Sequence, residues 1–436
     1  MAAPAGRARQ DRRAGQRRAA GAGRQGVTHP FRRRSPPIAP PTARPRYLLL
    51  FVLLFLGWGV LSPLLPVVLV EQGAAPSQVA LLLGLGVGLR LVVMPLAGVL
   101  ADRLGAPRQV LAAALLGAAL SVLGYAFACG LGPLLLVGVA HALATAPVGP
   151  LPDALAVREA ARIEAGRPRL NYGMVRGAGA AAFILANLGA GKAAELAGTP
   201  GIVLWLNALF FGLAAFAALG LPRPAAATPL AEASPALSGR GRRAIAAVLA
   251  LPGFRPLLLV SALIQGSHAF YISYAALSWQ AAGLGPFAVN ALWSLSVVAE
   301  VAVFFLFGRW LLAGLGPGGV CALAALAGVL RWSVLALDGP LPAIAFSQLL
   351  HGLTFAAQHL AAMAILTRLV PDRLAATAQS LLASLGNGLA TALLLLVSGP
   401  LHDWLGIGGF WAMAALCAIA LPLCFGLGGA ARDRSP

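Results

Sequence analysis

Charged side chains interrupt several long apolar runs of this chain. Residues 81–98 read LLLGLGVGLRLVVMPLAG, with Arg90 near the middle and no carboxylate among the ten residues that follow it. If such a run lies in a membrane, a charge there costs about 2.5–3.5 kcal/mol even on lenient scales, and it usually marks a transport path or a proton relay. Four more charged residues stand in comparable runs: Asp153, Arg176, Glu300 and Arg331. All five are candidates for a binding or proton-transfer site, with structural ion pairs as the alternative.

Histidine, tyrosine and amide side chains form a second group of candidates. His351 stands in an apolar run, and histidine can exchange protons near neutral pH. Gln265, His268 and Tyr271 follow one another at intervals of three residues, which places them on one face of a helix and suits a polar cavity wall. Gln358 either belongs to the same wall or faces a neighbouring helix.

The composition places these residues in a membrane protein. Of the 436 residues, 59% are hydrophobic and 10% are charged, and mean hydropathy is +0.83. A soluble chain of this size needs more polar surface, whereas a membrane-spanning helix needs about 20 mostly apolar residues. We therefore predict an all-α membrane protein with twelve transmembrane helices, at residues 47–70, 77–100, 107–129, 132–155, 173–197, 200–221, 254–280, 286–311, 316–336, 341–366, 373–399 and 405–428.

Basic residues mark one side of the predicted membrane. They crowd the N-terminal segment and follow spans 2, 4 and 6, whereas the connections 71–76, 130–131 and 281–285 contain no Lys or Arg. The positive-inside rule therefore places both termini in the cytoplasm. The net charge of +19 comes largely from the N-terminal segment and these loops, so we do not interpret it as a nucleic-acid-binding surface.

Composition also divides the chain into parts. Residues 1–46, rich in Arg, Ala, Pro and Gly, are expected to form a disordered cytoplasmic tail. The longest internal connection, 222–253, is expected to be a cytoplasmic linker between two six-helix bundles, at 47–221 and 254–428, with a short cytoplasmic tail at 429–436. The four cysteines lie in or at apolar spans and never as CxxC, so we expect small buried hydrophobic residues rather than disulfides or metal ligands.

An offset of 210 residues relates the two predicted bundles. It superimposes four pairs of residues: Gly98 on Gly308, Pro107 on Pro317, His141 on His351, and Arg90 on Glu300. Parallel repeats with a site between them are a common architecture of secondary transporters. Arg90 and Glu300 would then lie at equal depth, and they could pair with each other in the empty site. His141 is interpreted as a helix-packing residue that hydrogen-bonds a carbonyl.

The segment after the second span carries a motif. It reads GVLADRLGAPRQ, with Gly98, Asp102, Arg103 and Gly105 in order, and it resembles the loop signature of the major facilitator superfamily. The resemblance implies two six-helix bundles that move about a central site. Gly98 permits close helix contact, and Asp102 can cap the next helix or pair with a basic group, so this segment is predicted to be a charged latch. An ordinary basic loop with a turn glycine is the alternative.

Within this superfamily the chain is most similar to the branch that holds the lactose permease and the phenylpropionate permease-like transporters. The resemblance rests on the segments GVLSPLLPVVL, PLPDALAVR, NYGMVRGAG, LWSLSVVAEV, VLRW and LLHGLTF. The segments QGSHAFYISY and HGLTFAAQHLAAM, and Arg90, are more similar to the phenylpropionate permease-like transporters. Thr354 stands where the lactose permease has a glutamate central to proton release. The resemblance therefore implies another proton carrier and a substrate other than lactose.

The charges predicted to lie near the middle of the membrane do not balance. Arg90, Arg176 and Arg331 face only Asp153 and Glu300, which leaves one positive charge. A bound monovalent anion would neutralise it, and a carboxylate fits the planar fork of arginine. Aromatic residues in the same spans are candidates for the cavity wall, so an aromatic or other small carboxylic acid fits better than a neutral disaccharide.

These observations and the resemblance predict a proton-coupled secondary transporter, not an enzyme, that imports a small organic anion. Proton coupling is assigned to Glu300, Asp153 and His351. Substrate binding is assigned to six residues: Arg90, Arg176, Arg331, His268, Tyr271 and Gln358. No metal or cofactor is expected besides the proton gradient, and the expected partners are a small-molecule substrate and the bilayer of a bacterial inner membrane, with the monomer as functional unit. The alternatives are a sugar or nucleoside symporter, an exporter of the same fold, and a membrane-embedded enzyme or sensor.

Overall fold

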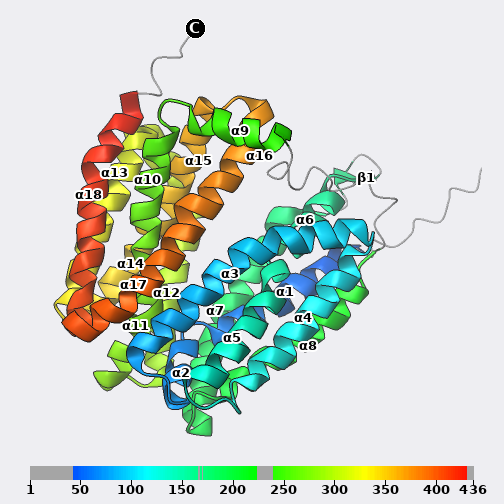
Figure 1. The fold of residues 1–436 in the computed structure, drawn as a ribbon, viewed down its shortest axis with the longest axis vertical. Coiled ribbons are helices and arrows are strands. Elements are labelled where there is room, and N and C mark those ends of the chain that lie inside the picture. Colours follow the sequence, from blue (N-terminus) through cyan, green and yellow to red (C-terminus); the bar gives the residue numbers. More distant parts are fainter. Residues whose placement is uncertain (1–42, 165–166, 169, 223–238, 430–436) are drawn as a thin grey trace, which may run out of the picture. The chain divides into compact units, whose positions relative to one another are not determined.

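The computed structural model describes residues 43–164, 167–168, 170–222 and 239–429, and most of them are helical (Figure 1). The elements before residue 222 are α1 (Ala43–Leu61), α2 (Leu65–Glu71), α3 (Pro76–Arg103), α4 (Pro107–Gly124), α5 (Leu131–Thr145), η1 (Ala146–Val148), α6 (Pro150–Ala160), the antiparallel pair β1 (Ile163–Glu164) and β2 (Arg167–Pro168), α7 (Tyr172–Ala197) and α8 (Ile202–Leu219). Those after residue 238 are α9 (Gly239–Leu249), α10 (Phe254–Gly266), α11 (His268–Ala281), α12 (Pro286–Ala302), η3 (Val303–Phe307), α13 (Gly308–Ala336), α14 (Leu341–Leu349), η4 (Gly352–Ala357), α15 (Gln358–Leu369), α16 (Asp372–Leu381), η5 (Leu382–Leu389), α17 (Ala390–Leu405), η6 (Gly406–Gly409) and α18 (Phe410–Gly429).

Ten helical runs among the described residues are long and apolar enough to cross a membrane. Eight of them contain 18 to 30 residues, close to the length of one crossing. The other two, Pro286–Ala336 and Asp372–Leu427, contain 51 and 56 residues. Each has an interior glycine with positive φ, 67° at Gly316 and 55° at Gly406, at the start of predicted spans 9 and 12. Glycine adopts this left-handed backbone at low cost, so both long runs are interrupted there.

Irregular turns divide some of the other predicted spans. The span 47–70 separates into α1 and α2 around Pro63 and Pro66, which have no backbone N–H to donate to a helix. The segments η3, η4 and η5 are π-helical, and all three belong to the part of the chain after residue 238. Such segments often mark functional sites, and η3 and η4 directly follow the regions of Glu300 and His351.

The predicted N-terminal tail is wrong at its last residues, because α1 begins at Ala43 and not at residue 47. Arg46 donates a hydrogen bond of 3.0 Å from Nη1 to the Gly220 carbonyl just after α8, and this contact ties the first turn of α1 to the bundle. Residues 1–42 of the predicted tail, residues 223–238 of the predicted linker and residues 430–436 lie outside the described residues. The linker also contains the helix α9.

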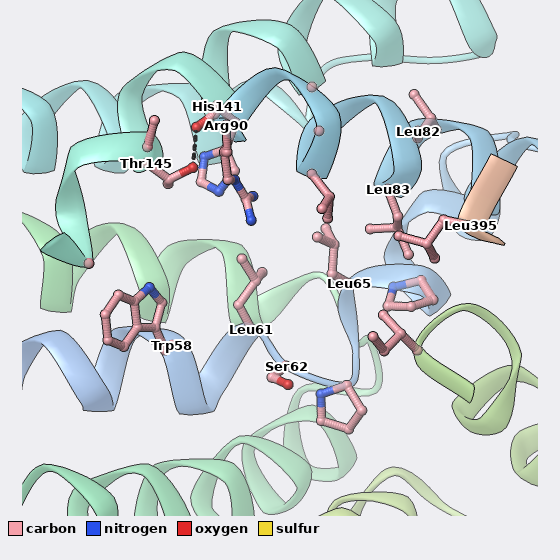
Figure 2. A pocket seen from close by; sticks show the side chains of 18 of the residues that line it. Trp58, Leu61, Ser62, Leu65, Leu82, Leu83, Arg90, His141, Thr145 and Leu395 are labelled. Carbon is pink, nitrogen blue, oxygen red and sulfur yellow. Dashed lines mark hydrogen bonds between the residues drawn. The ribbon is translucent and has the colours of Figure 1, made fainter. Parts of the chain in front are cut away.

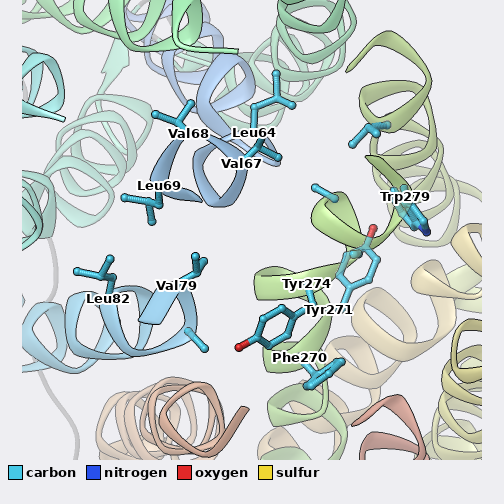
Figure 3. Close-up of a cluster of buried hydrophobic side chains, with 14 of the residues drawn as sticks. Leu64, Val67, Val68, Leu69, Val79, Leu82, Phe270, Tyr271, Tyr274 and Trp279 are labelled. Carbon is cyan, nitrogen blue, oxygen red and sulfur yellow. The ribbon is translucent and has the colours of Figure 1, made fainter. Parts of the chain in front are cut away.

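Buried apolar side chains form three clusters. One contains only residues between 43 and 221, and another contains only residues between 248 and 427. The third combines both halves of the chain, and Figure 3 shows its side chains from α2, α3 and α11. Each half therefore has a core of its own, and the two halves share an apolar contact region. Three of the four cysteines are buried as predicted, but Cys129 is exposed.

Small and polar residues bring α7 of the first half against α12 of the second. A Cβ atom at Gly191 would lie 2.8 Å from the Pro286 carbonyl oxygen, so this approach requires glycine. One turn earlier, the Asn187 carbonyl accepts a hydrogen bond of 2.8 Å from Asn290 Nδ2. One turn later, Glu195 Oε1 accepts a hydrogen bond of 3.2 Å from a backbone N–H in the first turn of α12. These contacts close the two halves onto each other near the C-terminal end of α7.

Replacing Gly191 by leucine should move α7 away from α12, because the added side chain meets backbone atoms that cannot yield like a flexible side chain. Spin labels on cysteines introduced at the exposed positions Ala197 and Ala282, in a Cys129→Ser background, report the separation as a distance distribution. Gly189→Leu is the matched control, since a Cβ atom there has nothing within 4 Å. The distance should lengthen only in Gly191→Leu, and an unchanged distance would show that the contact tolerates a side chain.

Candidate functional site

A cavity of about 550 Å³ is lined mainly by residues of the first half. Its volume lies in the range of roughly 300–1,000 Å³ that is typical of small-molecule sites. The aromatic part of its wall consists of Trp58, Tyr125, Phe183, Phe211 and Trp293, and its polar part includes Ser62, Arg90, His141 and Thr145. Figure 2 shows Arg90 next to His141 and Thr145 on one side of this space, with Trp58 and Leu61 across from them.

Arg90, on α3, is the charged side chain among the residues that line this cavity. Its Nε is buried and has no hydrogen-bond partner within the described part of the chain. Tyr125 and His141 interact with it electrostatically, but neither is an anion that would neutralise the guanidinium. In this conformation no ion pair joins Arg90 to Glu300 among the described residues, so the cavity contains an unpaired positive charge.

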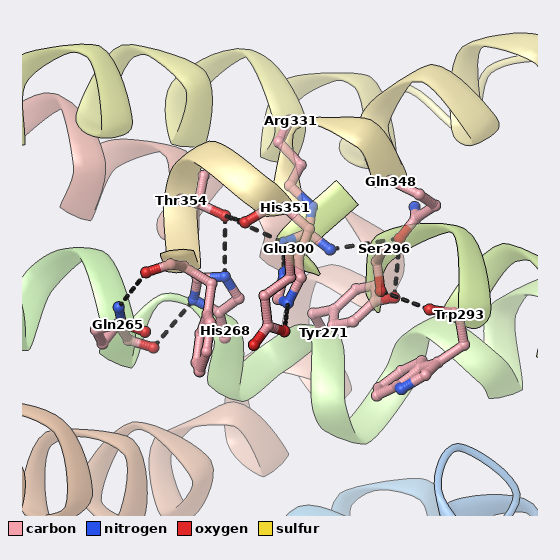
Figure 4. A network of polar contacts seen from close by, with 11 residues as sticks. Gln265, His268, Tyr271, Trp293, Ser296, Glu300, Arg331, Gln348, His351 and Thr354 are labelled. Carbon is pink, nitrogen blue, oxygen red and sulfur yellow. Dashed lines mark hydrogen bonds and ion pairs between the residues drawn. The ribbon is translucent and has the colours of Figure 1, made fainter. Parts of the chain in front are cut away.

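In the second half, the completely buried Arg331 of α13 organises a polar network, which Figure 4 shows. Its Nη1 lies 2.9 Å from Nδ1 of His351, and its Nη2 lies 3.4 Å from Oε1 of Gln348. Its guanidinium carbon stands 4.5 Å from the ring centres of both Tyr271 and Trp332. Hydrogen-bond acceptors and ring faces therefore surround the charge, which offsets the cost of burying it.

Glu300 approaches this network from α12. Its Oε2 lies 3.7 Å from Nε2 of His351, and 25% of its side chain is exposed. Because arginine only donates hydrogen bonds, the contact with Arg331 makes His351 Nδ1 the acceptor and leaves the proton of the neutral ring on Nε2, the nitrogen that faces Glu300. Arg176 and His359 also interact electrostatically with this carboxyl. The structure thus brings Glu300, His351 and Arg331 together, with Tyr271 against the guanidinium.

The predicted polar face of α10 and α11 is buried in the same network and does not line the cavity. Gln265 donates a hydrogen bond of 2.7 Å to Oε1 of Gln358, and Tyr271 donates one of 2.8 Å to Oε1 of Gln348. His268 Nε2 lies 3.1 Å from the threonine hydroxyl of η4. These side chains are satisfied by one another in this conformation. Any contact with a substrate would need a rearrangement of the network.

Asp153 and Arg176 form an ion pair of 3.5 Å, as their resemblance to a carboxylate–arginine pair implied. Tyr172 donates a hydrogen bond of 3.1 Å to the same carboxylate oxygen, and Arg176 stands 5.0 Å from the ring centre of Phe55. The exposed fractions of the two charged side chains are 37% and 43%, so the pair contributes little to stability. Neither residue lines the cavity.

The predicted latch residues lie around the end of α3. The side chains of Asp102 and Arg103 make no hydrogen bond or ion pair with other described residues, and Gly105, with φ of 58°, turns the chain toward α4. A Cβ atom at Gly98 would meet nothing within 4 Å, whereas at Gly308, its counterpart by the offset, it would meet the backbone of η3 at 2.9 Å. Arg108, later in the same motif, donates a hydrogen bond of 3.2 Å from Nη1 to the Leu219 carbonyl at the end of α8. The latch function of the segment stays a prediction.

Sequence reasoning missed Gln348, which is completely buried and accepts hydrogen bonds from both Arg331 and Tyr271. The spacing of Gln348 from His351 could have revealed it. Gln348 stands three residues before His351, so both lie on one face of a helix, and a buried amide beside a predicted site histidine could have been included.

Comparison with known proteins decides the family. The MFS_1 like family matches residues 46–413. The chain belongs to this family. A probable 3-phenylpropionic acid transporter of Escherichia coli (strain K12) is 32% identical over 376 residues, which cover 85% of this chain and 93% of that protein. The maltose permease of Geobacillus stearothermophilus is 28% identical over 372 residues, which cover 85% of this chain and 91% of that protein.

Solved structures agree with this assignment. The crystal structure of the nucleoside transporter NupG matches with a TM-score of 0.71 and 17% identity, covering 91% of this chain and all of that chain. A crystal structure of the peptide transporter POT matches with a TM-score of 0.64 and 17% identity, covering 90% of this chain and 96% of that chain. The predicted resemblance is therefore confirmed, and this family member is a multi-pass membrane transporter with the major facilitator fold.

Replacing Tyr271 by phenylalanine should destabilise the protein by about 1 kcal/mol, because Gln348 loses its shortest hydrogen bond in a buried site. Tyr274, on the same helix, is the matched control. Its hydroxyl is buried without a partner among the described residues, so Tyr274→Phe should leave stability unchanged or raise it. Reversible unfolding of the purified protein in mixed SDS micelles measures both, and equal losses would contradict the role assigned to the Tyr271–Gln348 hydrogen bond.

Proposed function

We propose that the protein is a proton symporter that imports a small aromatic carboxylate. The observation that carries the proposal is the Arg90 guanidinium, which has no counterion among the described residues and lies in a cavity whose wall is otherwise uncharged and includes five aromatic side chains. The planar fork of arginine can bind a carboxylate with two parallel hydrogen bonds, and ring faces can enclose an aromatic group. The similarity to the protein named as a probable 3-phenylpropionic acid transporter supports the same substrate class.

Glu300 is the proposed proton carrier. Its carboxyl is partly exposed, so protons can reach it, and it lies next to the Nε2 of His351. The ionised carboxylate would attract this ring nitrogen, and protonation would weaken that attraction and free the second half to move. Asp153 is the alternative carrier, because its ion pair with Arg176 would also respond to protonation.

The proposed topology has twelve crossings, with both termini in the cytoplasm of a bacterial inner membrane. Gly316 and Gly406 would divide the two longest helical runs into two crossings each, which raises ten candidate runs to twelve. The basic residues after spans 2, 4 and 6 support the orientation. Movement of the two halves of a monomer about their shared contact region would then expose the cavity to one side of the membrane at a time.

Uptake by proteoliposomes tests the proposed function. Labelled 3-phenylpropionate, maltose and a nucleoside are offered with and without an inward proton gradient. We expect accumulation of the aromatic acid alone, and only with the gradient. Accumulation of maltose would instead identify a sugar symporter, in line with the similarity to the maltose permease. Uptake that does not respond to the gradient would refute proton coupling.

Glu300→Gln should abolish accumulation of 3-phenylpropionate, because an amide cannot carry a proton in a cycle of binding and release. Exchange of labelled for unlabelled substrate across the membrane should continue, since exchange needs no net proton movement. Asp153→Asn is the comparison variant and should still accumulate substrate. If Glu300→Gln accumulates substrate at the rate of the unaltered protein, the proton carrier is Asp153 or His351.

Arg90→Gln should weaken binding of 3-phenylpropionate about 10- to 100-fold, because a hydrogen bond to a charged group contributes about 1.5–3 kcal/mol. Affinity for the neutral analogue 3-phenylpropanamide should change much less. Arg46→Gln is the control, since Arg46 interacts with the Gly220 carbonyl and does not line the cavity. Isothermal titration calorimetry measures each affinity, and equal losses for the acid and the amide would show that Arg90 does not hold the carboxylate.

A further inference from the structure

The hydrogen bonds of His141 determine which of its ring nitrogens carries the proton. His141 lies on α5 with 4% of its surface exposed, and its Nδ1 is 3.0 Å from the hydroxyl oxygen of Ser121. That hydroxyl donates its one proton to the Ala118 carbonyl over 3.1 Å. With the serine proton assigned to that carbonyl, the hydrogen between the serine oxygen and Nδ1 comes from the imidazole.

The other ring nitrogen is an acceptor that lies at the cavity. With its proton on Nδ1, the neutral ring has a lone pair on Nε2. The ring lines the cavity, and its one hydrogen bond with described residues is at Nδ1, which leaves Nε2 without a partner there. Thr145 does not compete for it, because its hydroxyl donates to the His141 carbonyl over 2.6 Å. Figure 2 shows His141 beside Arg90, so an acceptor and a cation are adjacent on one wall.

This pair has a chemical preference that a carboxylate alone does not satisfy. A carboxylate held by Arg90 has no proton to donate, so His141 Nε2 would remain without a partner. A donor on a carbon close to the carboxylate would fill that position. An ammonium group is disfavoured there, because the guanidinium repels a second positive charge. A hydroxyl group has the required proton and no charge.

We propose that the cavity selects hydroxy-substituted carboxylates, in which the carboxylate binds Arg90 and a hydroxyl on the second or third carbon donates to His141 Nε2. The proposal rests on the proposed function, since it takes Arg90 as the carboxylate site. Ser121 is then a positioning residue, because it holds the tautomer of His141 that can accept.

Binding of three related acids to the purified protein tests the selection. The acids are 3-phenylpropionate, its 2-hydroxy derivative and its 2-methoxy derivative, and the last keeps the oxygen but has no proton to donate. The hydroxy acid should bind about three- to tenfold more tightly than 3-phenylpropionate, the ratio that a net hydrogen-bond contribution of about 0.5–1.5 kcal/mol gives. The methoxy acid should show no such gain. Equal affinities for the hydroxy acid and 3-phenylpropionate would overturn the proposal without any variant being needed.

Variants then locate the effect. His141→Phe should reduce the ratio of the affinities for the hydroxy acid and 3-phenylpropionate to about one, whereas His402→Phe, at a histidine outside the cavity wall, should leave this ratio unchanged. A preference that survives in folded His141→Phe would overturn the assignment. If 3-phenylpropionate and both derivatives fail to bind the unaltered protein, the proposed function is refuted and this inference with it. If they bind without discrimination, only this inference is refuted.

Discussion

The complete burial of the Arg331 guanidinium constrains the interior of the second half of the molecule. A charge taken out of water needs acceptors or ring faces around it, because an unpaired buried charge costs several kcal/mol. Three helical segments supply them, with Tyr271 from α11, Gln348 from α14, and His351 at the start of η4. Because arginine only donates hydrogen bonds, Gln348 Oε1 and His351 Nδ1 must accept them. The proton of the neutral His351 ring is then on Nε2, the nitrogen that faces Glu300.

Arg90 has the same side chain in the opposite situation. Both Nη atoms of Arg331 have acceptors and two rings face its guanidinium, although its Nε, like that of Arg90, is buried without a hydrogen-bond partner among the described residues. The Arg90 guanidinium has no such acceptors in the described part of the chain and adjoins a cavity. A charge that the protein itself satisfies stabilises one arrangement of helices. A charge left unsatisfied in a cavity can instead be satisfied by a ligand, and this difference separates a structural arginine from a binding one.

The sequence predicted the helices well because each had to satisfy a simple length and hydropathy requirement. It failed at the start of α1, where the hydrogen bond between Arg46 and Gly220 joins residues 174 positions apart and leaves no local pattern. For the site, the cost of charges in apolar runs pointed to Arg331 and Glu300, which the structure places in one polar network with His351, and their roles in transport stay predictions. The offset of 210 residues suggested that Arg90 and Glu300 could pair, but equivalent positions in two repeats need not face each other.

The two histidines related by that offset show how neighbours give one residue type two roles. Ser121 and the Ala118 carbonyl make Nδ1 of His141 a donor, so its Nε2 can accept a hydrogen bond at the cavity. Arg331 makes Nδ1 of His351 an acceptor, so the ring proton of His351 is on Nε2, which faces Glu300. On the proposed function, the first arrangement serves substrate recognition and the second serves proton transfer. The substrate would then bind in one half and the proton in the other. Because Arg90 and Glu300 make no direct contact in this conformation, only the movement of one half against the other could couple the two binding events.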